Sequence, residues 1–320
     1  MNRQTRLEPG KPSMRACFAA LCILAAASIS ACGEGADRAV PPPRRGVESP
    51  PSTPSTTPPP PSPTPTPSTP VSQDVLALRL YESASVHATL STSHHYYMAY
   101  DDRVWPWDCV QMSLDGAPTP AVLPTGSHTF AASFDRCYVD FLVGTWLDGT
   151  ASSTYAATDL NELTAQVSAN SMRGKLANFR SDLYDVTADG SATWTRVRTG
   201  TAWTTSWAET TTYRPTIGST LTNNSTNNVA TFEGGSYTQS WGPPPPGGTA
   251  IHEEFDDLAV AVSGTSYTLN GSLDSFYWNV GTRSYTGEIR ITSCGTLVAR
   301  IYADASGARQ TEILTPLASF

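Results

Sequence analysis

The stretch richest in side chains that could do chemistry is "HEEFDD", which contains His252, Glu253, Glu254, Asp256 and Asp257. If it forms a β-strand, His252, Glu254 and Asp256 share one face, because successive side chains of a strand point to opposite faces. A hydrolase could use paired carboxylates there as acid and base. The stretch also follows a "PPPPGG" loop and precedes an apolar run, which equally fits the solvated start of a strand. We therefore rank a hydrolase third among the functional hypotheses.

A second group with chemical potential is the histidine pair His94 and His95. On a strand these neighbours would point to opposite faces, so the pair does not predict a metal site. The sequence also contains none of the motifs HExxH, G-x-S-x-G, S-x-x-K, G-x-G-x-x-G, C-x-x-C or a Walker loop. We predict a protein that is not an enzyme, with no cofactor and no metal.

The tryptophans suggest binding, because eight are many for a chain of this length. Trp105 and Trp107 share a face of "VWPWD", and Trp203 and Trp207 lie in a Thr-rich run with few apolar residues. Exposed aromatic side chains on a β-sheet are similar to the sugar-stacking platforms of carbohydrate-binding modules. Core packing and the strand propensity of aromatic residues are the alternative explanation. A glycan-binding module is thus our second hypothesis, behind a non-enzymatic structural or binding protein.

Alternating apolar and polar residues indicate strands, as in "YTGEIRIT" (285–292) and "CYVDFLV" (137–143). Asx-Gly pairs supply the positive φ of tight hairpin turns, and we place turns at four of them. The expected fold is mainly β: an antiparallel meander, a sandwich or a partly open barrel, with at most one short N-terminal helix. The four pairs are Asp115-Gly116, Asp148-Gly149, Asp189-Gly190 and Asn270-Gly271.

The segment 72–90 fits two structures. A stripe of apolar residues at helical spacing follows the potential caps Ser72 and Asp74, while its even-numbered residues also alternate as in a strand. We predict a helix at 73–83 that continues as a strand. Two further segments, starting at Phe134 and Phe255, resemble each other, which either reflects common β composition or indicates two related halves of the domain.

Three cysteines belong to the folded part: Cys109, Cys137 and Cys294. An oxidising compartment permits disulfides, but an odd number leaves one cysteine over. Cys109 with Cys137 is the first choice, because their short separation suits adjacent strands. Cys137 with Cys294 would instead connect the two halves, and a simple buried thiol at Cys137 remains open.

The N-terminal region indicates export. From Met14, a more typical start than Met1, the chain carries Arg15 and then about thirteen mostly apolar residues, a normal signal length. That run is shorter than the roughly 20 residues that span a membrane. It ends in "ISAC" at Cys32, which resembles the lipobox of bacterial lipoproteins.

This resemblance implies cleavage of a signal peptide, residues 1–31, and acylation of Cys32 with diacylglycerol and palmitate, so that the protein binds the membrane through Cys32. Gly33 in place of an aspartate implies the outer membrane, on a face that the sequence does not specify. The "FDRC" (134–137) and "LNGS" (269–272) stretches are similar to those of uncharacterised β-rich lipoproteins of proteobacteria.

Fourteen of the thirty residues from Pro41 to Pro70 are proline. We expect residues 32–72 to form a disordered, extended linker that holds an all-β domain, residues 73–320, away from the lipid. Removal of residues 1–31 takes away four basic residues and one acidic residue, so the net charge of −8 becomes −11. Lys175 is the only lysine of the domain, which argues against nucleic acid as a partner. A polysaccharide or an envelope protein remains as the expected partner.

Overall fold

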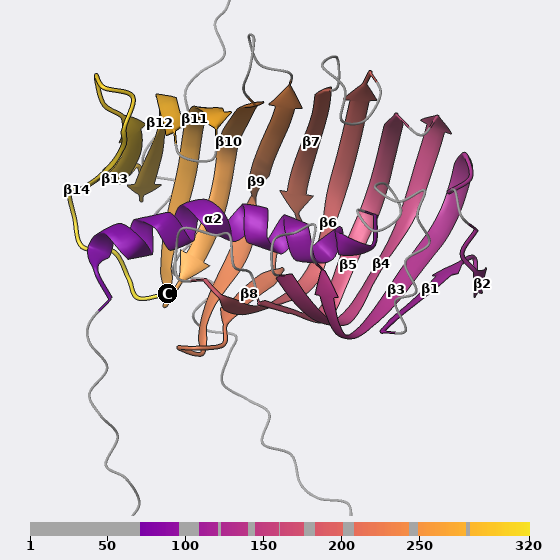
Figure 1. The fold of residues 1–320 in the computed structure, drawn as a ribbon. Helices are drawn as coiled ribbons and strands as arrows, with labels where there is room; N and C mark the ends of the chain where they lie inside the picture. The colour runs from indigo at the N-terminus through magenta and orange to yellow at the C-terminus, as the bar shows by residue number, and fades with distance from the viewer. Residues whose placement is uncertain are drawn as a thin grey trace, which may run out of the picture. The chain divides into compact units, whose positions relative to one another are not determined.

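The structure is a computed structural model that describes residues 71–95, 109–120, 123–139, 145–159, 161–175, 183–200, 208–242, 249–279 and 282–320. The predicted signal peptide, Cys32 and nearly all of the predicted linker lie outside these residues. The described part contains helix α2 (Gln73–Ser91) and one antiparallel sheet of fourteen strands (Figure 1). The strands are β1 (Val110–Leu114), β2 (Ala117–Pro118), β3 (Gly126–Val139), β4 (Thr145–Asp159), β5 (Glu162–Lys175), β6 (Asp185–Thr199), β7 (Ala208–Pro215), β8 (Thr220–Asn223), β9 (Asn228–Gly242), β10 (Thr249–Val262), β11 (Thr265–Asn279), β12 (Thr282–Ser293), β13 (Thr296–Ala303) and β14 (Arg309–Ile313).

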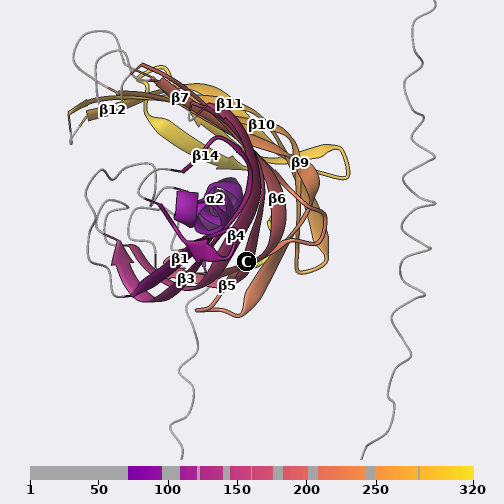
Figure 2. The same ribbon diagram turned by 90° about the vertical axis from the view of Figure 1, so that its right-hand side faces the viewer.

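The sheet is a meander in which nearly every strand pairs with its neighbours in the chain. The order runs β14-β13-β12-β11-β10-β9-β7-β6-β5-β4-β3-β1-β2, and the short β8 pairs with β6 and β9 beside this path. The predicted mainly antiparallel β class is therefore confirmed, in the form of a single meandering sheet. The sheet curves around α2 (Figure 2). We call the side that packs on the helix the inner face and the opposite side the outer face.

Helix α2 is longer than predicted. Ser72 caps it, its hydroxyl accepting from the backbone N–H of Val75 at 3.4 Å, and the helix runs without interruption to Ser91. The predicted change to a strand after residue 83 is wrong. Apolar residues occur around most of the helix circumference because the curved sheet surrounds it, and this pattern imitates strand alternation. The buried apolar side chains of the helix are Leu76, Ala77, Leu80, Tyr81, Ala84, Val86 and Leu90.

Large aromatic side chains line the inner face beneath the helix, which lies across the strands (Figure 1). We call them the aromatic row, since Trp194, Tyr213, Tyr237 and Phe255 are successive partners in the register of β6, β7, β9 and β10. All four are buried. The helix contacts this row along its length: Tyr81 packs on Phe255 with ring centroids 5.4 Å apart. Burial of such side chains is the main stabilising contribution to the domain.

The strands bend next to the aromatic row, at a line of β-bulges. Three of the four Asx-Gly pairs lie on this line, in the middle of β4, β6 and β11, and only Asp115-Gly116 forms a hairpin turn. The predicted turns at Asp148-Gly149, Asp189-Gly190 and Asn270-Gly271 are therefore wrong. These glycines have φ values of 114°, 111° and 113°, and the positive φ that suggested a turn instead lets a strand bend.

The Asx side chain of such a pair accepts a hydrogen bond from the backbone of the neighbouring strand. A bulge leaves a backbone N–H without its ladder partner. The Asp189 carboxylate accepts from the N–H of Ser171 at 2.6 Å, and Asn270 Oδ1 accepts from the N–H of Asp257 at 2.9 Å. Ser171 and Asp257 are the positive-φ residues of the adjacent bulges, at 49° and 48°. The Asx-Gly sequence thus encodes a bend shared by two strands.

The two similar segments share this geometry. A bulge follows Phe134 in β3 and another follows Phe255 in β10, and each phenylalanine lies opposite a glycine, Gly149 and Gly271 respectively. That the domain consists of two related halves stays a prediction.

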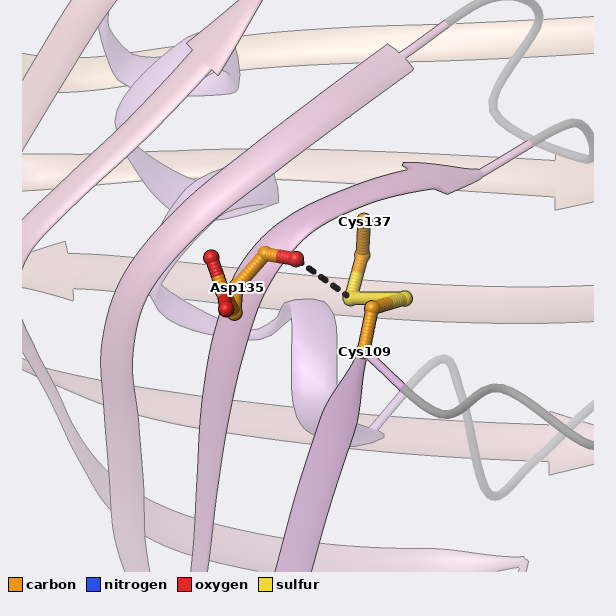
Figure 3. The surroundings of a disulfide bond; sticks show 3 residues. All are labelled: Cys109, Asp135 and Cys137. Carbon is orange, nitrogen blue, oxygen red and sulfur yellow. Dashed lines mark hydrogen bonds between the residues drawn. A yellow bond between two sulfur atoms is a disulfide. The ribbon is translucent and has the colours of Figure 1, made fainter.

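The structure joins Cys109 to Cys137 in a disulfide with a Cα–Cα distance of 5.4 Å (Figure 3). It connects the residue before β1 to the strand β3, with which β1 pairs. Cys294 is exposed and unpaired, with φ 49° in the turn between β12 and β13. The alternative Cys137–Cys294 bond is absent from the structure.

Candidate functional site

The acidic stretch that begins at His252 is divided between the two faces of β10. His252 and Glu254 lie on the outer face, as the alternation predicts, with His252 Nε2 3.9 Å from the Glu254 carboxylate. His252 Nδ1 lies 2.5 Å from Asp274 Oδ1 on β11. Asp257 belongs to the bulge, where its carboxylate accepts from the Asn270 amide. The outer-face members of the stretch therefore form solvent-exposed polar contacts and do not enclose a cleft.

Glu253 points the other way and is half-buried on the inner face. Its carboxylate accepts from the hydroxyls of Tyr81 on the helix and Tyr237 on β9, the latter at 2.7 Å. Burial is the largest influence on this carboxyl and raises its pKa, against the two tyrosine hydrogen bonds, which lower it. The Glu253 carboxylate thus connects α2 to the sheet through these two hydrogen bonds.

The two adjacent histidines meet at the end of the helix. Residues 93–95 continue in helical conformation, so the side chains of His94 and His95 lie on one side of the chain and not on opposite faces of a strand. Their Nε2 atoms lie 3.1 and 2.7 Å from the hydroxyl of Ser153 on β4. A serine hydroxyl has one proton to donate, so one Nε2 accepts from it and the other donates to it.

These histidines are enclosed by aromatic rings. His95 packs against Trp194, with ring centroids 5.0 Å apart, and His94 packs against Phe130 at the same distance. Burial lowers the pKa of both, that of His94 to about 3. Their Nδ1 atoms have no hydrogen-bond partner in the described part of the chain. A Ser–His catalytic pair needs a third group on that nitrogen to orient the ring. We therefore interpret the cluster as polar packing.

A different set of side chains fits a binding site. We call it the inner row: it crosses the inner face from β6 to β12, each member opposite the next in the strand register. Its members are Arg198, Glu209, Trp241, Ile251, Ser275 and Tyr285.

The inner row lies beside the helix and not beneath it. Each of its first four members is four residues from the aromatic row on the same strand, as Trp241 is from Tyr237, which corresponds to about 13 Å. A helix with its side chains has a radius of only about 5–6 Å. Trp241 is half-buried, and its indole N–H donates to the Gln239 amide oxygen at 3.0 Å. The Arg198 guanidinium donates to the Glu209 carboxylate on the neighbouring strand.

The row ends among basic side chains. The Arg283 guanidinium lies 5.5 Å from the ring centre of Tyr285 and donates to its hydroxyl at 3.0 Å. Arg309, at the start of β14, lies 5.9 Å from the same ring. Glu209, Ile251, Ser275 and Tyr285 are buried, so the half-buried indole of Trp241 and the neighbouring Gln239 amide are the groups that the row offers to a polar ligand.

The tryptophans predicted to stack on sugars, Trp105, Trp107, Trp203 and Trp207, lie outside the described residues. Among the described ones, Trp194 is buried in the aromatic row, and Trp146 lies beneath Lys175 with the ammonium 5.5 Å from the indole centre. Sequence reasoning missed Trp241. The alternation of "SYTQSW" placed Tyr237, Gln239 and Trp241 on one face and could have indicated it.

A groove of about 590 Å³ lies at the β1–β4 edge of the sheet. Its lining is neutral and mostly small, with Gly116, Ala131 and Ser152 among the lining residues. It offers no charged or aromatic side chain to orient a ligand, so we do not assign it a function.

Comparison with known proteins gives no match to a family model, a curated protein or a solved structure. Within the residues that the structure describes, no helix is long and apolar enough to cross a membrane. In the same residues, no three His, Cys, Asp or Glu side chains gather in a way that would hold a metal ion.

Proposed function

We propose that this protein is a lipid-anchored protein of the bacterial envelope whose β domain is a non-enzymatic binding module, carried on a proline-rich stalk. Acylated Cys32 would attach it to the outer membrane, and the linker would hold the β domain away from the lipid. The observation that carries the binding role is the inner row, in which half-buried Trp241 lies in register with the Arg198–Glu209 ion pair.

The chemistry of this row favours a polyhydroxylated ligand. An indole face covers the C–H face of a sugar ring, while an amide beside it bonds to the ring's hydroxyls. Gln239 fixes the Trp241 indole through a hydrogen bond, which reduces the entropy lost when a ligand is bound. This supports a carbohydrate-binding module as the specific form of the proposal, with Trp241 in the stacking role. An envelope protein is the alternative partner.

A binding screen of the full chain against polysaccharides and peptidoglycan tests the proposal. The Trp241→Ala variant should lose at least about 1 kcal/mol of binding free energy, the size of one stacking contact. Trp146→Ala is the matched control, because Trp146 lies on β4 beneath the Lys175 ammonium of β5, away from the inner row. The carbohydrate-binding form of the proposal is wrong if no polymer is retained, or if both variants bind as the unaltered chain does.

A further inference from the structure

We propose that β14 forms an antiparallel, edge-to-edge pair with the β14 of a second copy of this chain. This pairing does not depend on the proposed glycan binding. It starts from the two ends of the sheet, which are β14 and β2 (Figure 1). In the part of the chain that the structure describes, β14 pairs with β13 alone. One row of its backbone N–H and C=O groups is therefore open to a further strand.

The two end strands differ in how they are protected. Proteins usually block an edge strand by making it very short or by placing proline or lysine in it, because an open edge pairs with other chains. β2 is blocked in this way, since it has two residues and one of them is Pro118. β14 has five residues, RQTEI, with no proline and no lysine. An open edge on a sheet whose other edge is blocked indicates that β14 has a partner strand.

The ladder between β14 and β13 determines which residues face the open side. The N–H of Leu314 donates to the carbonyl of Val298, in the register of the ladder. Every second residue counted back from Leu314 therefore bonds to β13, because hydrogen-bonded pairs alternate along an antiparallel ladder. The residues between them direct their backbone groups to the open side. These are Arg309, Thr311 and Ile313.

A second β14 fits this edge about a two-fold axis at Thr311. Thr311 then faces Thr311 of the second copy, and Arg309 of each copy faces Ile313 of the other. Each of these pairs exchanges two backbone hydrogen bonds across the interface. The same groups are satisfied on both copies, as an interface with two-fold symmetry requires.

The side chains agree with this register. Gln310 faces Glu312 of the second copy, so that an amide lies opposite a carboxylate and no like charges are opposed. Just beyond the strand, Leu314 faces Ala308 of the second copy. Leu314 is 50% exposed in the single chain, and Ala308 is exposed as well. The pairing would cover this apolar surface, which stabilises the dimer.

Sedimentation velocity of the full chain over a wide range of concentrations tests the pairing. The unaltered chain should shift toward twice the mass of one chain as its concentration rises. Thr311→Pro should keep the mass of one chain, because proline removes an N–H that points to the second copy and not to β13. Thr311→Val is the matched control: it keeps this N–H and should dimerise like the unaltered chain.

A cysteine trap tests the register and remains informative if Thr311→Pro fails to fold. The parent is Cys294→Ser, which lacks the exposed native cysteine, and linkage is counted above that of this parent. Under mild oxidation Thr311→Cys should form a disulfide-linked dimer, because a hydrogen-bonded pair has Cα atoms about 5.5 Å apart, a distance that a disulfide spans. Ala117→Cys, on the opposite edge strand, should stay a single chain.

Four results would overturn the inference. The unaltered chain could keep the mass of one chain at every concentration, which would leave β14 to a segment of another protein. A folded Thr311→Pro could still dimerise. Thr311→Cys could stay unlinked, or Ala117→Cys could link as readily as Thr311→Cys.

Discussion

A Cβ atom on Gly271 would come within 2.2 Å of the carbonyl oxygen of Glu288 on the neighbouring strand. Gly271 also has a φ of 113°, which L-residues rarely adopt. We predict that Gly271→Ala destabilises the protein by about 3 kcal/mol or more, because strained backbone and an overlap with β12 add together. Denaturant unfolding of the purified chain measures this loss.

The matched control is Gly264→Ala, in the turn between β10 and β11. Gly264 has a φ of 79°, but a Cβ there would meet nothing within 4 Å. Gly264→Ala should lower the free energy of unfolding by only about 1–2 kcal/mol, which comes from the left-handed backbone conformation alone. If the two variants lose equal unfolding free energy, the close contact with β12 is not the reason for glycine at position 271.

The Asx-Gly pairs also show where sequence reasoning stops. Alternation correctly predicted strands, and an Asx-Gly pair correctly predicted positive φ, because both are local properties. Whether positive φ closes a hairpin or bends a long strand depends on the register with the adjacent strand. Asp189 accepts from Ser171, and Asn270 from Asp257, across such a register. The same limit explains the helix, whose length is set by the sheet that surrounds it.

Acid should destabilise the domain through its buried histidines. Burial lowers the pKa of His87 to about 4 and that of His94 to about 3, and it also lowers that of His95. The unfolded chain therefore binds more protons below pH 6.5, so stability falls as pH decreases from 6.5 toward 4. For His87 alone this amounts to about 3 kcal/mol at pH 4. Unfolding free energies at pH 7.5, 6 and 5 measure the slope.

His94→Phe should make this slope shallower, since it removes one titrating group and keeps an aromatic ring against Phe130. His128 provides the opposite sign: it is half-buried, and the hydrogen bond to the Asp115 carboxylate raises its pKa, so His128→Asn should leave the slope unchanged or slightly steeper. Glu253, whose pKa burial raises, binds its proton more readily in the folded state, so it opposes the histidines as the pH falls toward 4.5. A slope that His94→Phe does not alter would contradict this explanation.

Removal of the Cys109–Cys137 disulfide should lower stability by about 3 kcal/mol, because the bond closes a loop with a sequence separation of 28 residues. Cys109→Ser/Cys137→Ser should therefore unfold at lower denaturant concentration than the unaltered protein. Cys294→Ser should unfold like the unaltered protein, because Cys294 is exposed in a turn. In the native, non-reduced chain an alkylating reagent should modify Cys294 and leave Cys109 and Cys137 unmodified.

The candidate site was only partly accessible from the sequence. His252 and Glu254 share a face as alternation predicts, and Trp241 could have been found with the same reasoning. The meeting of His95 with Ser153, 58 positions apart, could not, because it depends on where a helix ends against a particular strand. The inner row likewise depends on the register of six strands, which no short motif records.

The lipid anchor gives the remaining prediction. If Cys32 is the acylated N-terminus, the chain expressed with its signal in a Gram-negative host should incorporate labelled palmitate and partition with the outer membrane. Cys32→Ser should abolish labelling, and it should either release the protein from the membrane or leave its signal peptide uncleaved. The reason is that several acyl chains together hold a protein on a bilayer, and this variant lacks them. Cys294→Ser should keep both label and membrane association, which separates the lipidated cysteine from the exposed one. Labelling that survives Cys32→Ser would show that the anchor lies elsewhere in the chain.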